Sequence, residues 1–447
     1  MVIVLVMMAL TIYHLMQWTQ GHMGFIAVVA AGSFVWLAVQ LYLAHSHHDI
    51  LVDPEELIRE RHFDVRVVVP IHNEDQTTFH AFLNSVANQT YQPSFTYLID
   101  DGSYKLVDGV KVVDTSAKEV FDSFLAENPH MASRMSFVYI PNGGKRNAQA
   151  IAFRKLGDSD VVFTIDSDTV LDSNAIANGI MPYTDPNVMS VGGLLHGLNA
   201  NSSMLTRMTN LGFVLSFLNG RASWSRVGSV AVHCGGLASY RSWIVLKYLD
   251  EYENQVVFGR RRTSGDDRVL TNFALLEGKC VIQESCVGYT LLPESWKHLT
   301  NQRIRWWRSF FWGTLWLIGR FPMNRLAWWL VATQIVTFVL YSIVLPVSLV
   351  IHPIMFGYLP VLFLAYLFVI GYARSVRYLT VSRPDESARQ QLVTVLLTPL
   401  SVLLHLYLCS VLQYVGLFTV NNGGWSTRKT VEVGIQALPG AALDLKV

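Results

Sequence analysis

The sequence predicts an α/β domain inserted between membrane-spanning helices. Hydrophobic residues make up 51% of the 447 positions and charged residues only 15%, which is too apolar for an ordinary soluble enzyme. The apolar residues collect in long runs near both ends of the chain. The middle instead alternates short β-branched runs with helix-sized segments, as in a parallel sheet covered by helices.

The N-terminal end contains two apolar stretches, residues 2–18 and 24–44, each about long enough to cross a bilayer as a helix. No lysine or arginine occurs before Arg59, so no basic segment of a signal peptide precedes the first stretch. Arg59, Arg61 and Arg66 follow the second stretch, and such charges favour the cytoplasmic side. We therefore expect a transmembrane hairpin and a cytoplasmic central domain.

The C-terminal third contains two more candidate spans, Ala327–Ile351 and Ile354–Tyr372, followed by an arginine-rich loop that should be cytoplasmic. The last apolar stretch, about 392–420, contains Pro399 and is too long for one simple crossing, so we expect a span with an interfacial helix or a re-entrant hairpin. The expected regions are the hairpin (1–44), the cytosolic domain with interface helices at about 296–318 (45–325), the C-terminal helices (326–420) and a tail (421–447).

The strands are expected at 66–70, 95–100 and 161–165, each a short β-branched or aromatic run that ends in a polar loop. Ligand sites of parallel α/β sheets lie beyond the carboxyl ends of such strands. The polar residues that follow these runs are therefore the first candidates for a functional site.

The composition also excludes several classes. A formal net charge of +1 leaves no electrostatic footprint for nucleic acid, so we expect no nucleic-acid partner. The cysteines form no C-x-x-C pair and have no metal-ligand spacing: Cys234, Cys280, Cys286 and Cys409. We expect neither a disulfide framework nor a zinc site, and the sequence gives no sign of an obligatory protein partner.

The strongest candidate for chemistry is the acidic pair Asp166 and Asp168, directly after the run 161–165. Two carboxylates one residue apart in a tight turn can hold a divalent cation, which neutralises a diphosphate as it leaves. Such a pair also occurs in ordinary exposed loops. Its neighbours in the sequence therefore have to decide between the two interpretations.

Two further clusters suit a nucleotide. Asp100 and Asp101 precede Gly102, and an aspartate there can accept hydrogen bonds from a uracil or a ribose while glycine allows a sharp turn. Lys145 and Arg146 follow two glycines and open a helix-like segment, a combination that suits phosphate. Taken alone, either cluster is equally a solvated turn.

Two later segments contain residues suited to proton transfer and to binding a sugar. Asp266 and Asp267 lie at the start of a helical pattern, where an aspartate can act as a general base or simply cap the helix. Residues 302–308 interleave arginines with tryptophans. That pattern favours an amphipathic helix at a membrane interface, and indole faces can also stack on an acceptor sugar.

The order of these motifs resembles the processive family 2 glycosyltransferases, which include hyaluronan, chitin and cellulose synthases and chitin-oligosaccharide synthases. Five motifs in register, over nearly the whole chain, carry the resemblance. Ser264–Asn272 and Val232–Arg241 look most like hyaluronan synthases, and Gly424–Lys429 is similar to their Trp-Gly-Thr gating segment, with Ser426 in place of the glycine. The resemblance implies a glycosyltransferase A-type fold for the cytosolic domain.

The resemblance also implies roles for individual residues. The nucleotide would be bound by Asp100, Asp101, Lys145, Arg146, Asp166, Gln302, Arg303, Arg305 and Trp306. Mn²⁺ or Mg²⁺ would be held by Asp168 with Asp166, and catalysis would fall to Asp267, as the base, with Asp266. The acceptor would meet Cys234, Tyr240, Arg241 and Trp306, and a gate would form from Trp425, Thr427 and Arg428. Cys234 is otherwise a small buried hydrophobic residue.

The expected activity is inverting transfer by direct displacement from UDP-sugar donors to a growing polysaccharide, by a plasma-membrane protein whose spans carry the product through the lipid bilayer. UDP-GlcA and UDP-GlcNAc are the expected donors. A glucuronate needs a nearby cation, and Arg260, Arg261 and Arg262 are candidates, although a surface charge run explains them better. The alternatives are a chitin- or cellulose-like synthase with one donor, a non-processive lipid-phosphate glycosyltransferase, and a transporter or receptor.

Overall fold

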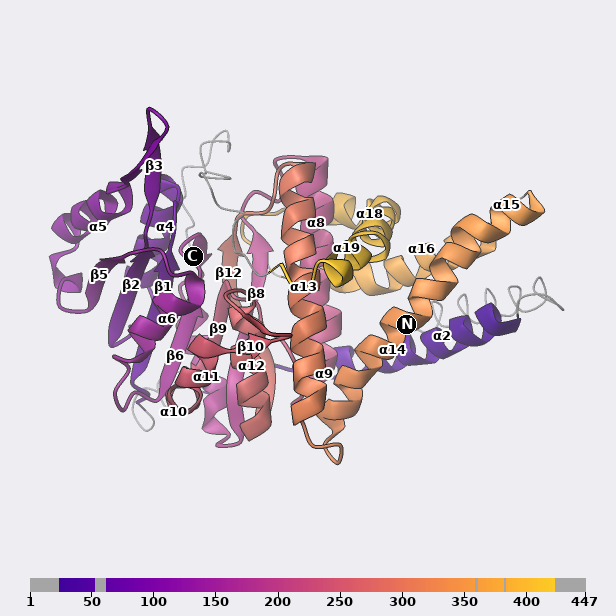
Figure 1. Ribbon diagram of the computed structural model, residues 1–447, viewed down its shortest axis with the longest axis horizontal. Coiled ribbons are helices and arrows are strands. Elements are labelled where there is room, and N and C mark those ends of the chain that lie inside the picture. The colour runs from indigo at the N-terminus through magenta and orange to yellow at the C-terminus, as the bar shows by residue number, and fades with distance from the viewer. Residues whose placement is uncertain (1–23, 53–61, 358–360, 382, 423–447) are drawn as a thin grey trace.

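The computed structural model describes residues 24–52, 62–357, 361–381 and 383–422, and Figure 1 shows a sheet-containing part beside a bundle of long helices. The sheet has eight strands in the order β5-β2-β1-β6-β9-β8-β12-β7. Their bounds are Val65–Ile71 (β1), Phe95–Asp101 (β2), Met135–Ile140 (β5), Val161–Ile165 (β6), Thr169–Leu171 (β7), Val188–Gly197 (β8), Leu237–Arg241 (β9) and Lys279–Thr290 (β12). The three runs that the sequence predicts as strands are β1, β2 and β6.

The sheet is mixed, which corrects the expectation of a parallel sheet. β1 pairs in parallel with β2 and β6, and β8 pairs in parallel with β12. β9 runs antiparallel to both β6 and β8, with Leu237 opposite Ile165. Because of that direction, the loop that leads into β9 lies beside the end of β6, where the Asp166 pair begins.

Helices cover both faces of the sheet. The alternating side chains of β1 explain why: Val65, Val67 and Val69 point into one buried cluster and Val68 into the other. The first cluster includes residues of α4 (Gln76–Ala87), α5 (Ser116–Glu127), α7 (Ala175–Ile180) and α8 (Met204–Leu215). The second includes residues of α6 (Lys145–Phe153), α10 (Ser242–Lys247), α11 (Leu249–Asn254), α12 (Asp266–Glu277) and α13 (Trp296–Arg320).

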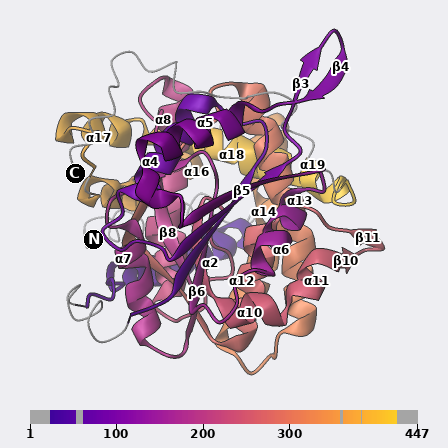
Figure 2. The ribbon, with the colours of Figure 1, turned by 90° about the vertical axis from the view of Figure 1, so that its left-hand side faces the viewer.

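Two small hairpins extend from this domain. β3 (Tyr104–Val107) and β4 (Val110–Val113) project away from it, as Figure 2 shows, and β10 (Val256–Val257) pairs with β11 (Arg260–Arg261) just before α12. The short helical turns are η1 (Pro129–Met131), η2 (Met181–Thr184) and η3 (Ser216–Arg221), and η3 continues α8 into α9 (Ala222–Ser225).

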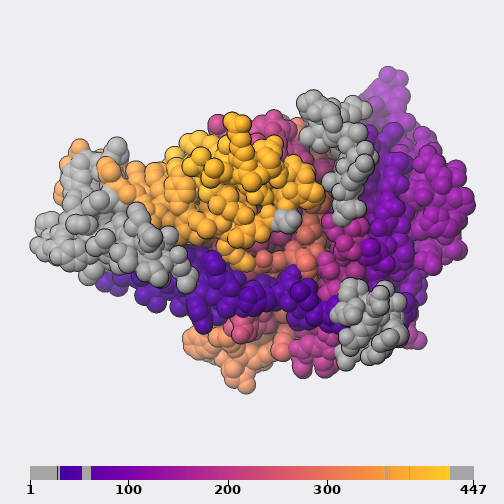
Figure 3. Space-filling model, turned by 180° about the vertical axis from the view of Figure 1, so that it is seen from behind, coloured from indigo at the N-terminus to yellow at the C-terminus, as the bar shows by residue number. Residues whose placement is uncertain are grey.

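The helical part contains α2 (Gly24–His45), α14 (Leu326–Pro346), η4 (Val347–Ile351), α15 (His352–Phe356) and α16 (Val361–Ser375). Leu37 and Leu41 of α2 share a buried cluster with residues of α14 and α16, and Figure 3 shows α2 lying along the C-terminal helices. Two helices in the described residues are long and apolar enough to cross a membrane, Leu326–Phe356 and Thr398–Phe418. The first helix runs on to Phe356, five residues beyond the end expected from the sequence.

The last apolar stretch forms α17 (Ala388–Leu396), α18 (Thr398–Ser410) and α19 (Leu412–Phe418), with Pro399 in the first turn of α18. Proline is tolerated there because the first amide groups of a helix need no partner within the helix. At one end, the Ser401 hydroxyl donates to the Met208 carbonyl on α8 at 3.3 Å. At the other end, Arg262 donates to the Val420 carbonyl at 2.8 Å. The segment from α18 to Val420 is therefore held at one end to α8 and at the other end to the residues that precede α12.

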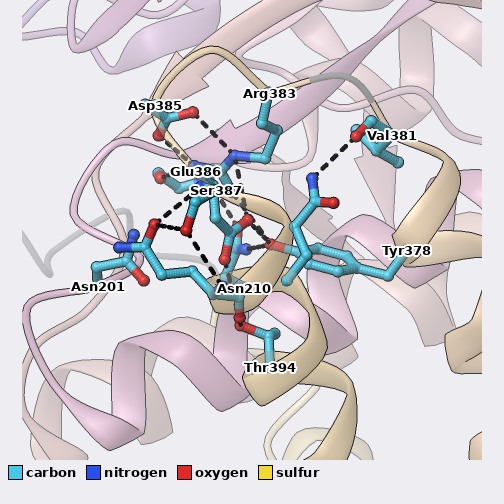
Figure 4. A network of polar contacts seen from close by, with 12 residues as sticks. Asn201, Asn210, Tyr378, Val381, Arg383, Asp385, Glu386, Ser387 and Thr394 are labelled. Atoms are coloured by element: carbon cyan, nitrogen blue, oxygen red, sulfur yellow. Dashed lines mark hydrogen bonds and ion pairs between the residues drawn. The ribbon is translucent and has the colours of Figure 1, made fainter.

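A buried polar network joins the segment after α16 to the sheet domain (Figure 4). The Tyr378 hydroxyl, in η5 (Val376–Thr380), donates to Glu386 at 2.7 Å and accepts a hydrogen bond from Asn210 of α8 at 2.9 Å. Arg383 donates to the same hydroxyl at 3.3 Å and to the Gly197 carbonyl at the end of β8 at 3.2 Å. The network fixes residues 376–381 and 383–387 to α8 and to the edge of the sheet, and we call it the 376–387 clamp.

Candidate active site

A cavity of about 420 Å³ lies between the ends of the strands and the helices α8, α13 and α18. The sequence-predicted residues that line it are Lys145, Asp166, Asp168, Cys234, Asp266, Asp267, Gln302, Arg303, Arg305 and Trp306. They come from segments far apart in the chain, and only the fold brings them together. This cavity is the candidate active site.

Lys145 is the electrostatic centre of the cavity. Its ammonium lies 2.7 Å from an Asp166 oxygen and 2.8 Å from an Asp266 oxygen. Burial by itself would lower the pKa of Lys145, but the two carboxylates outweigh burial and raise it. Lys145 is therefore a permanent cation that holds one carboxylate of the acidic pair next to one of the Asp266–Asp267 pair.

Two glycines before β9 make room for this arrangement. A Cβ atom at Gly235 would lie 3.2 Å from the Lys145 ammonium, and one at Gly236 would lie 3.1 Å from the Thr169 hydroxyl. Either contact is tighter than side chains normally accept. The backbone therefore approaches Lys145 and Thr169 this closely because glycine has no side chain.

Asp266 and Asp267 open α12, directly after Gly265 in the left-handed conformation with φ at 70°. Burial would raise the pKa of Asp266, but the Lys145 ammonium outweighs it and the pKa is lowered. For Asp267, burial and the Asp266 charge both act to raise the pKa, and the net shift is upward. Asp266 thus stays ionised, and Asp267 is the group with the greater affinity for a proton.

Asp100 and Asp101 lie at the end of β2, but the cavity lining does not include them. Asp101 accepts hydrogen bonds from the amides of Gly143 at 2.7 Å and Gly144 at 2.9 Å, and Asp100 accepts one from the Ser103 amide at 2.8 Å. Asp101 thereby holds the glycine loop that precedes Lys145. Direct contact of either carboxylate with a nucleotide stays a prediction.

Arg146 also faces away from the cavity. Its guanidinium donates to the Ser264 carbonyl at 2.6 Å and to Gln255 at 3.0 Å, and it lies over the rings of Tyr252 and Trp312. These contacts tie the start of α6 to the segment that leads into α12. Arg146 therefore links the Lys145 segment to the Asp266–Asp267 segment, and its predicted contact with phosphate is untested.

Helix α13 supplies the opposite wall with Gln302, Arg303, Arg305 and Trp306. The Arg303 guanidinium lies 4.4 Å from the centre of the Trp306 ring, and burial lowers the pKa of Arg303 to about 10. The Trp306 ring stacks on Phe213 of α8 with the ring centres 6.2 Å apart. The predicted interfacial segment is thus a helix that presents cations and an indole to the cavity.

The three predicted acceptor residues around β9 separate in the structure. Cys234 lines the cavity, and burial raises the pKa of its thiol to about 11, so the thiol stays neutral. Tyr240 is buried and does not line the cavity, and its hydroxyl lies 3.4 Å from the Thr271 hydroxyl. Arg241 lies at the opposite end of β9, where it donates to the Val188 carbonyl at 2.8 Å. Arg241 is not among the residues that line the cavity, and its contact with an acceptor stays a prediction.

Several lining residues were missed from the sequence, among them Glu74, Arg221 and His405. Glu74 accepts a hydrogen bond from Ser167, inside the acidic pair, at 2.8 Å. It follows β1 as Asp166 follows β6, so the same strand-end pattern could have identified it. Arg221 and His405 carry no comparable local signal, because they approach the site from η3 and α18.

Two other sequence expectations concern residues outside the cavity. Arg262 donates to the Val420 carbonyl, Arg260 to the Asn421 carbonyl at 3.3 Å and Arg261 to the Glu253 carbonyl at 3.1 Å, so none of the three lines the site. Trp425, Thr427 and Arg428 lie outside the described residues. The last described residues nevertheless reach the segment just before Gly265, on the catalytic side of the molecule.

Comparisons with known proteins agree with this geometry. The model for glycosyl transferase family 2 matches residues 66–242. A hyaluronan synthase from Streptococcus pyogenes is 30% identical over 372 residues, which cover 83% of this chain and 84% of that protein. An N-acetylglucosaminyltransferase from Rhizobium sp. (strain N33) is 32% identical over 261 residues, covering 58% of this chain and 55% of that protein.

Among solved structures, a mannosyltransferase from Pyrobaculum calidifontis in complex with GDP-Man and Mn²⁺ has a TM-score of 0.54 at 15% identity, covering 90% of this chain and 99% of that chain. Its likeness shows the fold, that of an A-type glycosyltransferase. The chain belongs to the hyaluronan synthase family within the family 2 glycosyltransferases. It is a UDP-sugar-dependent glycosyltransferase of the kind that builds polysaccharides.

Proposed function

We propose that this protein is a processive, inverting hyaluronan synthase. It takes UDP-GlcA and UDP-GlcNAc at the cytoplasmic face and passes the polymer outward between its own helices. The observation that carries the proposal is the meeting, in one cavity, of groups suited to a leaving diphosphate and a group suited to an acceptor hydroxyl: Lys145, Asp166, Asp168, Asp267, Arg305 and Trp306.

The nucleotide end of the site is formed by Lys145 and the acidic pair, with Gln302, Arg303 and Arg305 facing them from α13. Cations around a leaving diphosphate stabilise the negative charge that develops on it in the transition state. Asp101 and Arg146 support this end indirectly, because they hold the two segments from which Lys145 and Asp266 project.

The donor set of the acidic pair fits a divalent cation such as Mn²⁺ or Mg²⁺. Mg²⁺ is commonly bound by one or two carboxylates together with substrate phosphates. Asp166 and Asp168 supply two carboxylates in the cavity, and the described residues contain no cluster of three or more ligands, so the diphosphate would complete the coordination. When bound, the cation neutralises charge on the departing diphosphate.

The transfer step follows from the placement of Asp267. The acceptor hydroxyl oxygen forms a bond to the anomeric carbon of the donor, while the bond from that carbon to the diphosphate oxygen breaks and UDP leaves. Asp267, whose pKa is raised by burial and by Asp266, takes the hydroxyl proton. Attack opposite the leaving group inverts the anomeric carbon, and no covalent enzyme intermediate is needed.

The proposal that the protein lies in a membrane and exports its product is supported by the helices outside the sheet domain. Polar product cannot cross hydrocarbon without a lined path. The cavity wall includes Leu404, His405 and Leu408 of α18, one of the two helices apolar enough to span, so the site opens onto candidate membrane helices. We place the catalytic domain in the cytoplasm and the protein in the plasma membrane, with lipid and polymer as its partners.

The test is synthesis by the purified protein supplied with UDP-GlcA, UDP-GlcNAc and Mn²⁺. A polymer that a hyaluronan-specific hydrolase degrades, and that forms only when both donors are present, is the expected result. EDTA should stop UDP release, and Mn²⁺ should restore it. Polymer from one donor alone would replace the proposal with a chitin- or cellulose-like synthase, and product that stays on the donor side of sealed vesicles would remove the export step.

A further inference from the structure

The two walls of the cavity differ in charge, because carboxylates occur on only one of them, where Lys145 and Arg268 accompany them. All the carboxylates that line it belong to the catalytic domain: Glu74, Asp75, Asp166, Asp168, Asp266 and Asp267. The wall formed by α8, η3, α13 and α18 contributes no described carboxylate, but it contributes three arginines: Arg221, Arg303 and Arg305. We call this surface the helical wall. A wall of this kind attracts an anionic ligand.

Arg221 is the cation on the helical wall that is best prepared for such a ligand. Its Nε donates to the Val232 carbonyl at 2.9 Å, its Nη1 donates to the Ser216 hydroxyl at 2.8 Å, and its guanidinium lies 4.4 Å from the centre of the Phe217 ring. The second terminal nitrogen, Nη2, has no hydrogen bond to any described residue, and no described carboxylate forms an ion pair with Arg221. A partly buried cation that is fixed at two nitrogens and forms no ion pair with a described carboxylate is costly unless a ligand supplies the anion.

The position of Arg221 indicates which part of the substrate it meets. Arg221 donates to the carbonyl of Val232, two residues before Cys234, and it lines the same cavity as Cys234 and Asp267. The proposed diphosphate groups of the catalytic domain gather around Lys145, which pairs with Asp166 and Asp266. Because Asp267 accepts the proton of the acceptor hydroxyl, a ligand group beside Arg221 belongs to the acceptor sugar and not to the donor diphosphate.

We propose that Arg221 binds the carboxylate of an acidic sugar at the growing end of the polymer, and so determines that a uronic acid unit is accepted there. This inference rests on the proposed function, because the acidic sugar has to reach the site as part of a growing chain. It concerns the acceptor, whereas Arg260, Arg261 and Arg262 were candidates for a donor glucuronate and bind backbone carbonyls outside the cavity.

The experiment uses enzyme that holds its own nascent chain. Chains are stalled by a chase with one donor, so that they end in either GlcA or GlcNAc, and the addition of the other, labelled sugar is then timed. In Arg221→Gln, addition to GlcA-ended chains should slow by about 30-fold or more relative to addition to GlcNAc-ended chains, the loss typical when a buried charge pair loses one partner. Arg221→Lys, which keeps the charge, should recover part of the difference.

The control is Arg226→Gln, an exposed arginine five positions further on that does not line the cavity, which should change both additions equally or not at all. Equal slowing of both additions in Arg221→Gln, or no slowing, would overturn the inference, since a purely structural defect does not distinguish the two chain ends. Weaker inhibition by UDP would instead assign Arg221 to the diphosphate. A wild-type enzyme that never uses UDP-GlcA would overturn the proposed function and this inference together.

Discussion

Asp266 and Asp267 are adjacent in the sequence, but the fold shifts their pKa values in opposite directions. The Lys145 ammonium, 2.8 Å from Asp266, outweighs burial there and lowers the pKa of that carboxyl. Asp267 has no ion pair with a described residue within 4.0 Å, so burial and the neighbouring charge raise its pKa. One carboxylate is thereby fixed as an anion, and the other can accept a proton from the acceptor.

The Asp267→Asn variant should turn over about 10²- to 10⁴-fold more slowly than the wild-type enzyme, because the amide cannot take the acceptor proton. UDP binding, measured by calorimetry, should be retained, since Lys145 and the acidic pair are unchanged. Near-normal synthesis by a folded Asp267→Asn protein would contradict the assignment.

The acid side of the pH profile checks the same residue. A base must be ionised to act, and the raised pKa of Asp267 means that its ionised form is lost at a higher pH than for an ordinary aspartate. Turnover should therefore be full above this pKa and fall about tenfold per pH unit below it. An acid limb at the pKa of a normal, exposed aspartate would argue against Asp267 as the base.

At the scale of elements, the start of α12 depends on its contact with α13. Gly265 has a φ of 70°, and a Cβ atom there would lie 2.1 Å from the Ser309 hydroxyl and 2.9 Å from the Trp312 ring. Both neighbours belong to the helix that carries Arg305 and Trp306. A side chain at this position would push the base and the opposite wall apart.

Gly265→Ala should therefore lower activity by about 100-fold, the loss that a displacement of roughly 1 Å can cause. Gly259→Ala is the matched control, because Gly259 has a φ of 71° but no atom within 4 Å of the added Cβ, so it carries the backbone strain without the clash. Specific activity and melting temperature should be measured for both proteins. Equal losses would show that strain, and not the spacing of the two helices, is responsible.

At the scale of the whole molecule, the 376–387 clamp joins the candidate membrane helices to the catalytic domain. The Tyr378 hydroxyl takes part in three hydrogen bonds, with Asn210, Arg383 and Glu386, and the residues around it are buried. Asn210 lies on α8, the helix whose Phe213 stacks on Trp306. The clamp therefore also sets the position of α8, which forms part of the cavity wall.

Tyr378→Phe removes only the hydroxyl and should destabilise the protein by about 1–3 kcal/mol, because buried partners lose their hydrogen bonds. Tyr372→Phe, whose exposed hydroxyl makes one hydrogen bond to the Leu396 carbonyl, should cost within about 0.5 kcal/mol. Thermal unfolding in detergent distinguishes the two variants. If Tyr378→Phe melted at the same temperature as Tyr372→Phe, the clamp would not bear on stability.

Much of the fold could be predicted from local patterns. β1, β2 and β6 follow from short β-branched runs, and the acidic pair at Asp166 lies directly after β6, where strand-end ligand sites are expected. The direction of β9 could not be predicted, because antiparallel pairing with β6 depends on contacts between segments far apart in the chain. That direction brings Cys234 to the site and leaves Arg241 at the far end of the strand.

The sequence by itself determined the class of chemistry: carboxylates, cations and indoles of the right kinds, in an order that resembles one family, between apolar runs. Residue type and local periodicity are properties of a few neighbouring positions, so they can be read without a fold. Only the tertiary structure decided that Asp101 and Arg146 support the site from outside its lining, and that Arg221 enters the helical wall. Those outcomes depend on which backbone groups each side chain reaches, and that is settled only when distant segments pack together.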